Sequence, residues 1–179
     1  MHKSAMDWLK RIRSEHYFEA PVLEIGSIDI NGSPRELWGN LKPYVGVDIV
    51  AGKNVDYVVD IREFDQFPPD DYYLTKPFHT IICTEVLEHV DSESIINAMW
   101  KFMHDTTKVV ITCAGLNRAI HSADGGQLKP NEYYENVDPD KLLEWLSNTP
   151  ENILVVDIQV FASSWAMDDV YAFAVYKVK

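Results

Sequence analysis

The sequence predicts an α/β fold in which helices wrap a mostly parallel β-sheet. Two short apolar runs, Val22–Gly26 and Tyr44–Asp48, end in a glycine or an acidic residue. Buried parallel strands end in this way at the ligand-bearing edge of an open α/β sheet. Strand-like and helix-like segments then alternate, and the last two runs are joined by Ser163–Asp169, which is too short for a crossover helix. We therefore expect a terminal antiparallel hairpin.

The predicted elements begin with an amphipathic helix over about residues 4–18, where Met6, Leu9 and Ile12 recur near helical spacing. The elements that follow are strand 22–26, helix 34–39, strand 44–49, strand 55–59, strand 79–83, helix 92–103, strand 108–113, helix 139–147, strand 153–161 and strand 170–178. This order is typical of a sheet whose connections are helical.

The segment after the first strand contains residues typical of a helix start, and its length sets the spacing between Gly26 and Asp48. Ser33 is an N-cap candidate, Pro34 suits the first helical position, and Glu36 stands where a capping box places its carboxylate. About twenty residues past Gly26, Asp48 closes the second strand, where nucleoside-binding folds place a carboxylate on the ribose hydroxyls. This spacing predicts a nucleoside-containing cofactor.

Composition favours one domain. The chain has 179 residues, of which 46% are hydrophobic and 12% aromatic, enough to bury a full core. We expect residues 1–179 to form a single domain, with a helix in 1–20 and the core in 21–179. No apolar run approaches membrane-spanning length, and the polar residues 1–4 have no apolar signal core behind them. We therefore expect a cytoplasmic protein with no membrane partner.

The net charge and the two cysteines restrict the kinds of partner and the thiol chemistry that we expect. A formal charge of −12 repels polyphosphate at long range, so general nucleic-acid binding would need a local basic patch. The one basic cluster, Lys10 to Arg13, is short and belongs to the first helix. Cys83 and Cys113 lie near the ends of apolar runs, which suits buried reduced thiols better than a structural disulfide. The charge argues against general nucleic-acid binding, and neither feature indicates the oligomeric state.

The order of elements, together with Glu24, Gly26, Asp48 and the segment Glu85–Val90, resembles the class I S-adenosylmethionine-dependent methyltransferases. The likeness covers the chain from about Pro21 to Lys179. Within that class the sequence is most similar to the small type 11-like group that includes the ubiquinone-pathway O-methyltransferases. The resemblance implies a Rossmann-like, doubly wound sheet of seven strands, with the cofactor across the carboxyl ends of the first, second and fourth strands.

The resemblance also assigns cofactor contacts. It implies that Glu24 helps to hold the methionyl amino group, that Asp48 accepts both ribose hydroxyls, and that Asp60 reads the adenine amino group. The full set of implied S-adenosylmethionine contacts is Glu24, Gly26, Ser27, Asp48, Ile49, Asp60, Ile61, Cys83, Thr84 and Glu85.

The first loop departs from the family pattern. The family commonly has three glycines there, whereas Ile28 and Ile30 occupy the second and third positions, and Gly32 supplies flexibility later. We therefore expect the loop to take a different path. A dinucleotide-binding domain would also place an acid after the second strand, but it needs the close glycine triplet that this loop lacks.

A possible metal site follows the fourth strand. Glu85, Glu88 and His89 fall at i, i+3 and i+4, so a helix beginning there would put all three side chains on one face. Two carboxylates and an imidazole suit a divalent cation such as Mg²⁺ or Mn²⁺, and His121 is a candidate fourth ligand. Some members of the resembled family hold a magnesium-like ion with such an arrangement. The alternative is that Glu85 alone faces the cofactor, while Glu88 and His89 cap and pair locally.

The segment Gly115–Gly126 lacks periodicity and follows a strand end. Long loops in compact domains are usually functional, and in the resembled fold this loop covers the substrate pocket. The candidate substrate contacts are Arg118, His121, Asp124, Tyr133 and Tyr134. The alternative is that the tyrosines are core residues that introduce the next helix, and that Asp124 begins a simple turn.

The function expected from this interpretation is transfer of a methyl group from S-adenosylmethionine to a small molecule (EC 2.1.1.-). In-line displacement needs a base near the acceptor proton, for which His121 is the first choice and His89 or Glu85 the second. The alternative is a catalytically inactive protein of this fold that binds a nucleoside cofactor or a protein partner. Fold-level likeness does not choose among oxygen, nitrogen and carbon acceptors.

Overall fold

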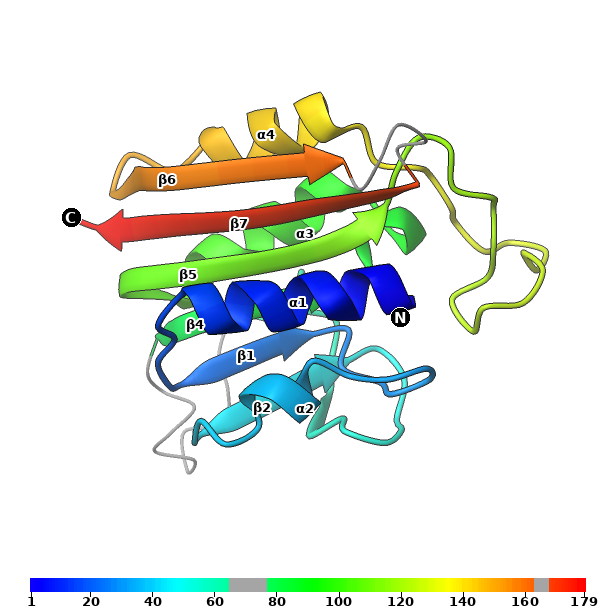
Figure 1. Ribbon diagram of the computed structural model, residues 1–179, viewed down its shortest axis with the longest axis horizontal. Helices are drawn as coiled ribbons and strands as arrows, with labels where there is room; N and C mark the ends of the chain where they lie inside the picture. The colour runs from blue at the N-terminus through cyan, green and yellow to red at the C-terminus, as the bar shows by residue number, and fades with distance from the viewer. Residues whose placement is uncertain (65–76, 163–167) are drawn as a thin grey trace.

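A seven-stranded sheet forms the centre of the computed structural model, in the order β3-β2-β1-β4-β5-β7-β6 (Figure 1). The structure describes residues 1–64, 77–162 and 168–179. The strands are β1 Val22–Ile25, β2 Tyr44–Asp48, β3 Tyr57–Val58, β4 Phe78–Thr84, β5 Met103–Ala114, β6 Ile153–Ala162 and β7 Asp169–Val178. The helices are α1 Lys3–Glu15, α2 Arg35–Trp38, α3 Ser92–Met99 and α4 Pro139–Ser147, with single 3₁₀ turns η1 Leu87–His89 and η2 Trp100–Phe102.

Strands β1 to β5 are parallel, and β7 is antiparallel to both β5 and β6. The predicted doubly wound, mostly parallel sheet with an antiparallel terminal hairpin is therefore confirmed. Of the expected hairpin connection, residues 163–167 lie outside the described part of the chain.

Two apolar layers hold the sheet between its helices. Figure 1 shows α1 and α2 on the near face and α3 and α4 behind. On the α1 side, Trp8 and Trp38 pack with Phe173 of β7. On the other side, Ile96 and Leu142 pack against the opposite face of the strands. All four residues of β1 are buried because helices cover both faces of the sheet.

Several element boundaries differ from the sequence prediction. Helix α2 begins at Arg35 rather than at Pro34, although Ser33 Oγ still accepts a 3.1 Å hydrogen bond from the Arg35 backbone N–H. Helix α3 ends at Met99, and β5 begins at Met103, five residues before the predicted start. The extension is polar and exposed in part, so it lacks the apolar signal of a buried strand. Met103 pairs with Phe78 of β4, and Thr106 and Thr107 pair with β7.

Helix α1 is anchored at both its apolar and its polar face. Trp8 stacks on Tyr171 with ring centroids 5.0 Å apart, and Leu9 is fully buried. Near its first turn, Ser4 Oγ donates a 2.8 Å hydrogen bond to Asp169 Oδ2 of β7. These contacts place the first residues of the chain at the carboxyl end of the sheet. No helix in the described ranges has the length and apolar character needed to span a membrane.

Candidate functional site

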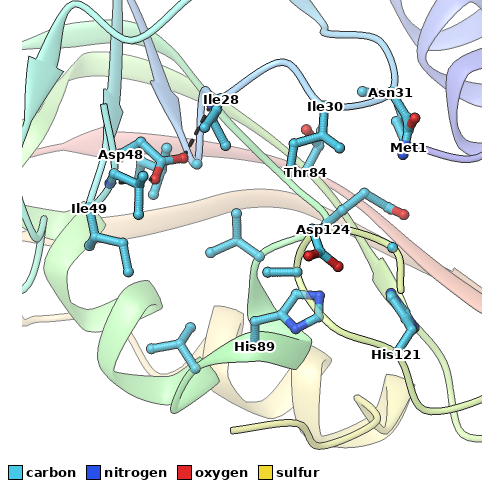
Figure 2. A pocket seen from close by; sticks show the side chains of 18 of the residues that line it. Met1, Ile28, Ile30, Asn31, Asp48, Ile49, Thr84, His89, His121 and Asp124 are labelled. Carbon is cyan, nitrogen blue, oxygen red and sulfur yellow. Dashed lines mark hydrogen bonds between the residues drawn. The ribbon is translucent and has the colours of Figure 1, made fainter. Parts of the chain in front are cut away.

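A cavity of about 1200 Å³ lies at the carboxyl ends of β1, β2 and β4. Its walls come from the segments after these strands, from the loop after β5, and from the first three residues of the chain. Figure 2 shows Asp48 and Ile49 at one end of the cavity and His89 and His121 at the other. The fold thus joins a predicted nucleoside-binding end to a histidine-rich end.

The turn after β1 requires a glycine. Gly26 has φ +73°, in the left-handed region, and a Cβ there would lie 2.0 Å from Val86 Cγ2. The backbone N–H groups of Gly26 and Ser27 both donate to the Val47 carbonyl, at 2.9 and 3.0 Å. The turn therefore presents bare backbone to the cavity.

The remainder of this loop takes a path of its own, as its sequence predicts. The Ile28 N–H donates to Asp48 Oδ2 at 3.2 Å, and the Asp29 N–H donates to the Lys53 carbonyl at 3.0 Å. Gly32, at φ +98°, donates to Asp29 Oδ1. Ile28 and Ile30 line the cavity in place of the missing glycines.

The predicted adenosine contacts gather at this end. Asp48 also accepts a 3.0 Å hydrogen bond from the Val50 N–H, so two amides fix its carboxylate. The Ile49 side chain is 68% exposed and lines the cavity. Asp60 and Ile61 line the same region, and a hydrogen-bonded ion pair with Arg62 lowers the pKa of Asp60.

Glu24 lies in a buried polar network beside the cavity. Its carboxylate accepts hydrogen bonds from the Tyr44 hydroxyl at 2.7 Å and the Ser33 hydroxyl at 3.2 Å, with Arg35 Nε 4.0 Å away. Burial raises the pKa of Glu24 to about 7, although these three partners favour the charged form. Glu24 thus stabilises the end of the first loop through Ser33 and Arg35, and it also lines part of the cavity wall.

Two predicted cofactor residues do not line the cavity. Ser27 and Cys83 are buried, at 1% and 0% exposure, whereas their neighbours Gly26 and Thr84 line the wall. Cys83 points into the apolar core because side chains alternate along β4. Cys83 and Cys113 are both free, and burial raises the pKa of each thiol, which confirms the prediction of buried, reduced cysteines.

Glu85 does not share a helical face with Glu88 and His89. It has φ +57° and precedes η1, so the expected i, i+3, i+4 face does not form. Its N–H donates to the Thr112 carbonyl at 2.7 Å, and its Oε1 accepts a 2.8 Å hydrogen bond from Thr112 Oγ1. Glu85 still lines the cavity, but Thr112 holds its carboxylate.

Glu88, His89 and His121 converge instead. One ligand atom from each lies within 4.8 Å of the others, a spacing that could hold a metal ion. Glu88 is fully buried, and neither of its carboxylate oxygens has a hydrogen-bond partner in the described structure. The amides of Glu88 and Ala114 lie near enough to favour the charged form, but burial and the charge of Glu85 raise the pKa of Glu88 to about 8. Glu88 is therefore a buried acid whose oxygens lack the hydrogen bonds that usually offset the free-energy cost of burying a carboxyl group.

The two histidines form an aromatic group with Tyr134. The rings of His89 and His121 are 5.2 Å apart, and Tyr134 is 5.4 and 5.0 Å from them. Burial, and then the nearby His121, lower the pKa of His89 to about 4, so it is neutral at physiological pH. His121 Nδ1 lies 3.0 Å from the Ala119 carbonyl, which can only accept. In neutral His121 the proton is thus on Nδ1, and Nε2 keeps a free lone pair.

Only some of the predicted substrate contacts line the cavity. Arg118, His121 and Asp124 line the cavity, with Arg118 paired to Asp169 and Asp124 to Lys129. Lys129, with the Gly126 amide and Ser122, lowers the pKa of Asp124 to about 2. Tyr133 is 47% exposed and donates to Glu135 instead of facing the cavity. Tyr134 contacts the histidine rings but is not part of the cavity wall.

Sequence reasoning missed the contribution of the first residues. Met1, His2 and Lys3 line the cavity, and the His2 ring meets that of His121 edge-on at 6.4 Å. The amphipathic pattern of residues 4–18 predicts a helix but not where its beginning lies. Only the packing of α1 across the sheet reveals this placement.

Comparisons with solved structures identify the fold. N-methyltransferase NodS from Bradyrhizobium japonicum WM9, in complex with S-adenosyl-L-homocysteine, matches with a TM-score of 0.58 and 15% identity over 97% of this chain and 85% of that one. A 1,6-didemethyltoxoflavin-N1-methyltransferase from Burkholderia thailandensis matches with a TM-score of 0.64 and 12% identity over 98% of this chain and 79% of that one. An S-adenosylmethionine-dependent methyltransferase from Clostridium acetobutylicum ATCC 824 matches with a TM-score of 0.60 and 11% identity over 98% of this chain and 90% of that one.

No protein-family model and no curated protein matches the sequence. At these identities the structural likeness establishes the fold, which is that of the class I S-adenosylmethionine-dependent methyltransferases.

Proposed function

We propose that this protein transfers a methyl group from S-adenosylmethionine to a small-molecule acceptor. The observation that carries the proposal is the continuity of the cavity, which runs from Gly26 and Asp48 to His89 and His121. The cofactor and a small acceptor can therefore meet within one space. Four of the matched structures hold S-adenosylhomocysteine, which supports the choice of cofactor.

The polar groups of the first two loops support one position for the cofactor. The fixed carboxylate of Asp48 would accept the ribose hydroxyls, Asp60 would accept from the adenine amino group, and the exposed Ile49 would pack on the adenine ring. The methionyl part would then lie along the bare backbone at Gly26, with its methyl directed to Thr84 and Glu85. In this position the sulfonium would lie in the middle of the cavity.

The reaction needs one nucleophile and one proton acceptor. The acceptor atom attacks the methyl carbon, the carbon–sulfur bond breaks, and its electron pair stays on sulfur in S-adenosylhomocysteine. The proton of the acceptor passes to His121 Nε2, whose lone pair is free because Nδ1 faces the Ala119 carbonyl. His89 is the second candidate, since it is neutral and lies beside His121.

A divalent cation is the alternative to a histidine base, because a His121 or His89 nitrogen that binds an ion cannot also accept the proton. The donor set of Glu88, His89 and His121 fits such an ion, because the unpartnered Glu88 oxygens would gain a positive partner. One carboxylate and two imidazoles suit Mn²⁺ better than Mg²⁺, which prefers oxygen ligands. When bound, the ion would lower the pKa of an acceptor hydroxyl. Glu85 is excluded from this donor set because Thr112 holds it.

The test separates binding from turnover. Calorimetry with S-adenosylmethionine should show one site, and methyl-labelled cofactor should label products from a panel of small hydroxyl and amine compounds. Binding without any labelled product would favour the alternative, a catalytically inactive protein of this fold that binds a nucleoside cofactor. Absence of binding would overturn both. The proposal places the reaction in the cytoplasm, where the two buried thiols would stay reduced.

A further inference from the structure

We propose that His2 is a further ligand of the cation held by Glu88, His89 and His121, so that the ion fastens helix α1 to the acceptor end of the cavity. This inference rests on the cation of the proposed function and adds a ligand from a part of the chain outside the methyltransferase-like core. It is carried by the placement of His2 beside His121.

The site has room in its coordination for another protein group. Only three groups converge in the described structure, and divalent ions of this kind take four to six ligands. The carboxylate that the sequence offered, Glu85, accepts from Thr112 instead. Any fourth protein ligand therefore comes from another element of the cavity wall.

His2 lies next to this group in the cavity wall. His2 occupies the N-cap position of α1, and its side chain makes no capping hydrogen bond. With metal–nitrogen bonds of about 2.1 Å, the ring centroids of two histidines on one ion lie up to roughly 6.5 Å apart. The His89 and His121 rings are 5.2 Å apart, and the His2 and His121 rings are 6.4 Å apart, which suits two imidazoles on opposite sides of one ion. The ring nitrogens of His2 are not among the ligand atoms that lie within 4.8 Å of one another, so the His2 side chain has to turn toward the ion.

Helix α1 holds the backbone of His2 beside the site before any ion binds. Ser4 Oγ bonds to Asp169, which also accepts from the Tyr171 hydroxyl at 3.1 Å and pairs with Arg118 in the cavity wall. Trp8 stacks on Tyr171 one turn further along. Little freedom of the helix is then lost on binding, which favours affinity.

Burial is the main cause that lowers the pKa of His2 in the absence of the ion. Arg118 acts against a charged His2, whereas Glu85 and Asp169 favour it. A cation shared by His2 and Glu88 would place positive charge beside buried acids, in a molecule of net charge −12 that attracts cations in general. Ion binding would thus tie three separate parts of the chain, α1, η1 and the loop after β5, into one unit.

The experiment measures Co²⁺ binding, using the visible absorption of the bound ion as the readout, in the wild type and in single variants. We expect His121→Ala to abolish binding and His2→Ala to weaken it by about tenfold or more, with a changed spectrum from the loss of one nitrogen ligand. His16→Ala is the matched control, because His16 follows the far end of α1 and stacks on Phe173. It should leave affinity and spectrum unchanged.

Hydrogen exchange gives a second readout that needs no turnover. Added Co²⁺ should slow exchange of the first turn of α1 in the wild type but not in His2→Ala. Unchanged affinity and spectrum in His2→Ala, with binding lost in His121→Ala, would overturn the role of His2 and leave the cation site standing. No Co²⁺ binding by the wild type would overturn both, whereas S-adenosylmethionine calorimetry judges the methyltransferase proposal independently.

Discussion

Gly26 and Val86 face each other so closely that a Cβ on Gly26 would lie 2.0 Å from Val86 Cγ2. Two segments far apart in the chain, the turn after β1 and the residue before η1, therefore define the centre of the cavity together. This contact and the φ of +73° at Gly26 each exclude a side chain.

Replacing Gly26 by alanine should destabilise the fold by about 2 kcal/mol or more, because strain at positive φ adds to the clash with Val86. Urea denaturation measures the loss. Gly32→Ala is the matched control, since Gly32 has φ +98° but a Cβ added there would lie 3.7 Å from its nearest neighbour, Met6 Cε. Equal losses in the two variants would show that the contact with Val86 contributes nothing.

Replacing Asp48 by alanine should weaken S-adenosylmethionine binding by roughly 1.5–3 kcal/mol, the usual scale for hydrogen bonds to charged groups. Calorimetry on the folded variant measures the change. Asp48→Asn keeps one oxygen, which can accept from either the Ile28 or the Val50 amide but not from both, so it removes the charge while keeping part of the loop's anchoring. Wild-type affinity in a folded Asp48→Ala protein would place the cofactor elsewhere.

If the cation site serves the reaction, Mn²⁺ should raise turnover and a chelator should abolish it. Glu88→Gln should then lose activity that excess ion partly restores, because the variant weakens metal affinity without removing all ligands. If His121 acts as a simple base, chelation should have no effect on the rate. Activity that persists in excess chelator, with Glu88→Gln near wild type, would remove the cation from the mechanism.

The buried Glu24 should make stability depend on pH. Its pKa is raised to about 7 from an ordinary value of 4.5, so between these pH values the folded protein keeps a proton that the unfolded chain releases. The free energy of unfolding should therefore fall as pH rises through this window, by at most about 1.4 kcal/mol per pH unit.

Glu24→Gln removes this contribution, so the wild type should lose stability relative to the variant between about pH 5 and about pH 7.5, as measured by urea denaturation. Comparing the two proteins cancels the titration of Glu88, which acts in the same direction, and of His89, which acts in the opposite one. Parallel stability curves would show that Glu24 is ionised throughout this range.

Much of the fold is predictable from local pattern. The apolar runs of β1, β2 and β4 are buried on both faces, and this leaves a clear hydrophobic signal. The ends of such strands are predictable too, which is why Asp48 and Gly26 lie at the cavity as expected. The polar start of β5 carries no such signal, because pairing with its neighbours rather than burial makes it a strand.

The sequence by itself determined the order of elements, the parallel sheet with its terminal hairpin, and the sheet edge at which the cavity lies, because each depends on short-range periodicity and on residues at strand ends. Tertiary structure alone decided which side chains meet at the histidine-rich end of the cavity. The left-handed φ of Glu85 turned its side chain to Thr112 and left Glu88 with His89 and His121. Packing of α1 brought His2 to the same place, since side chains distant in the chain meet only when helices dock on the sheet.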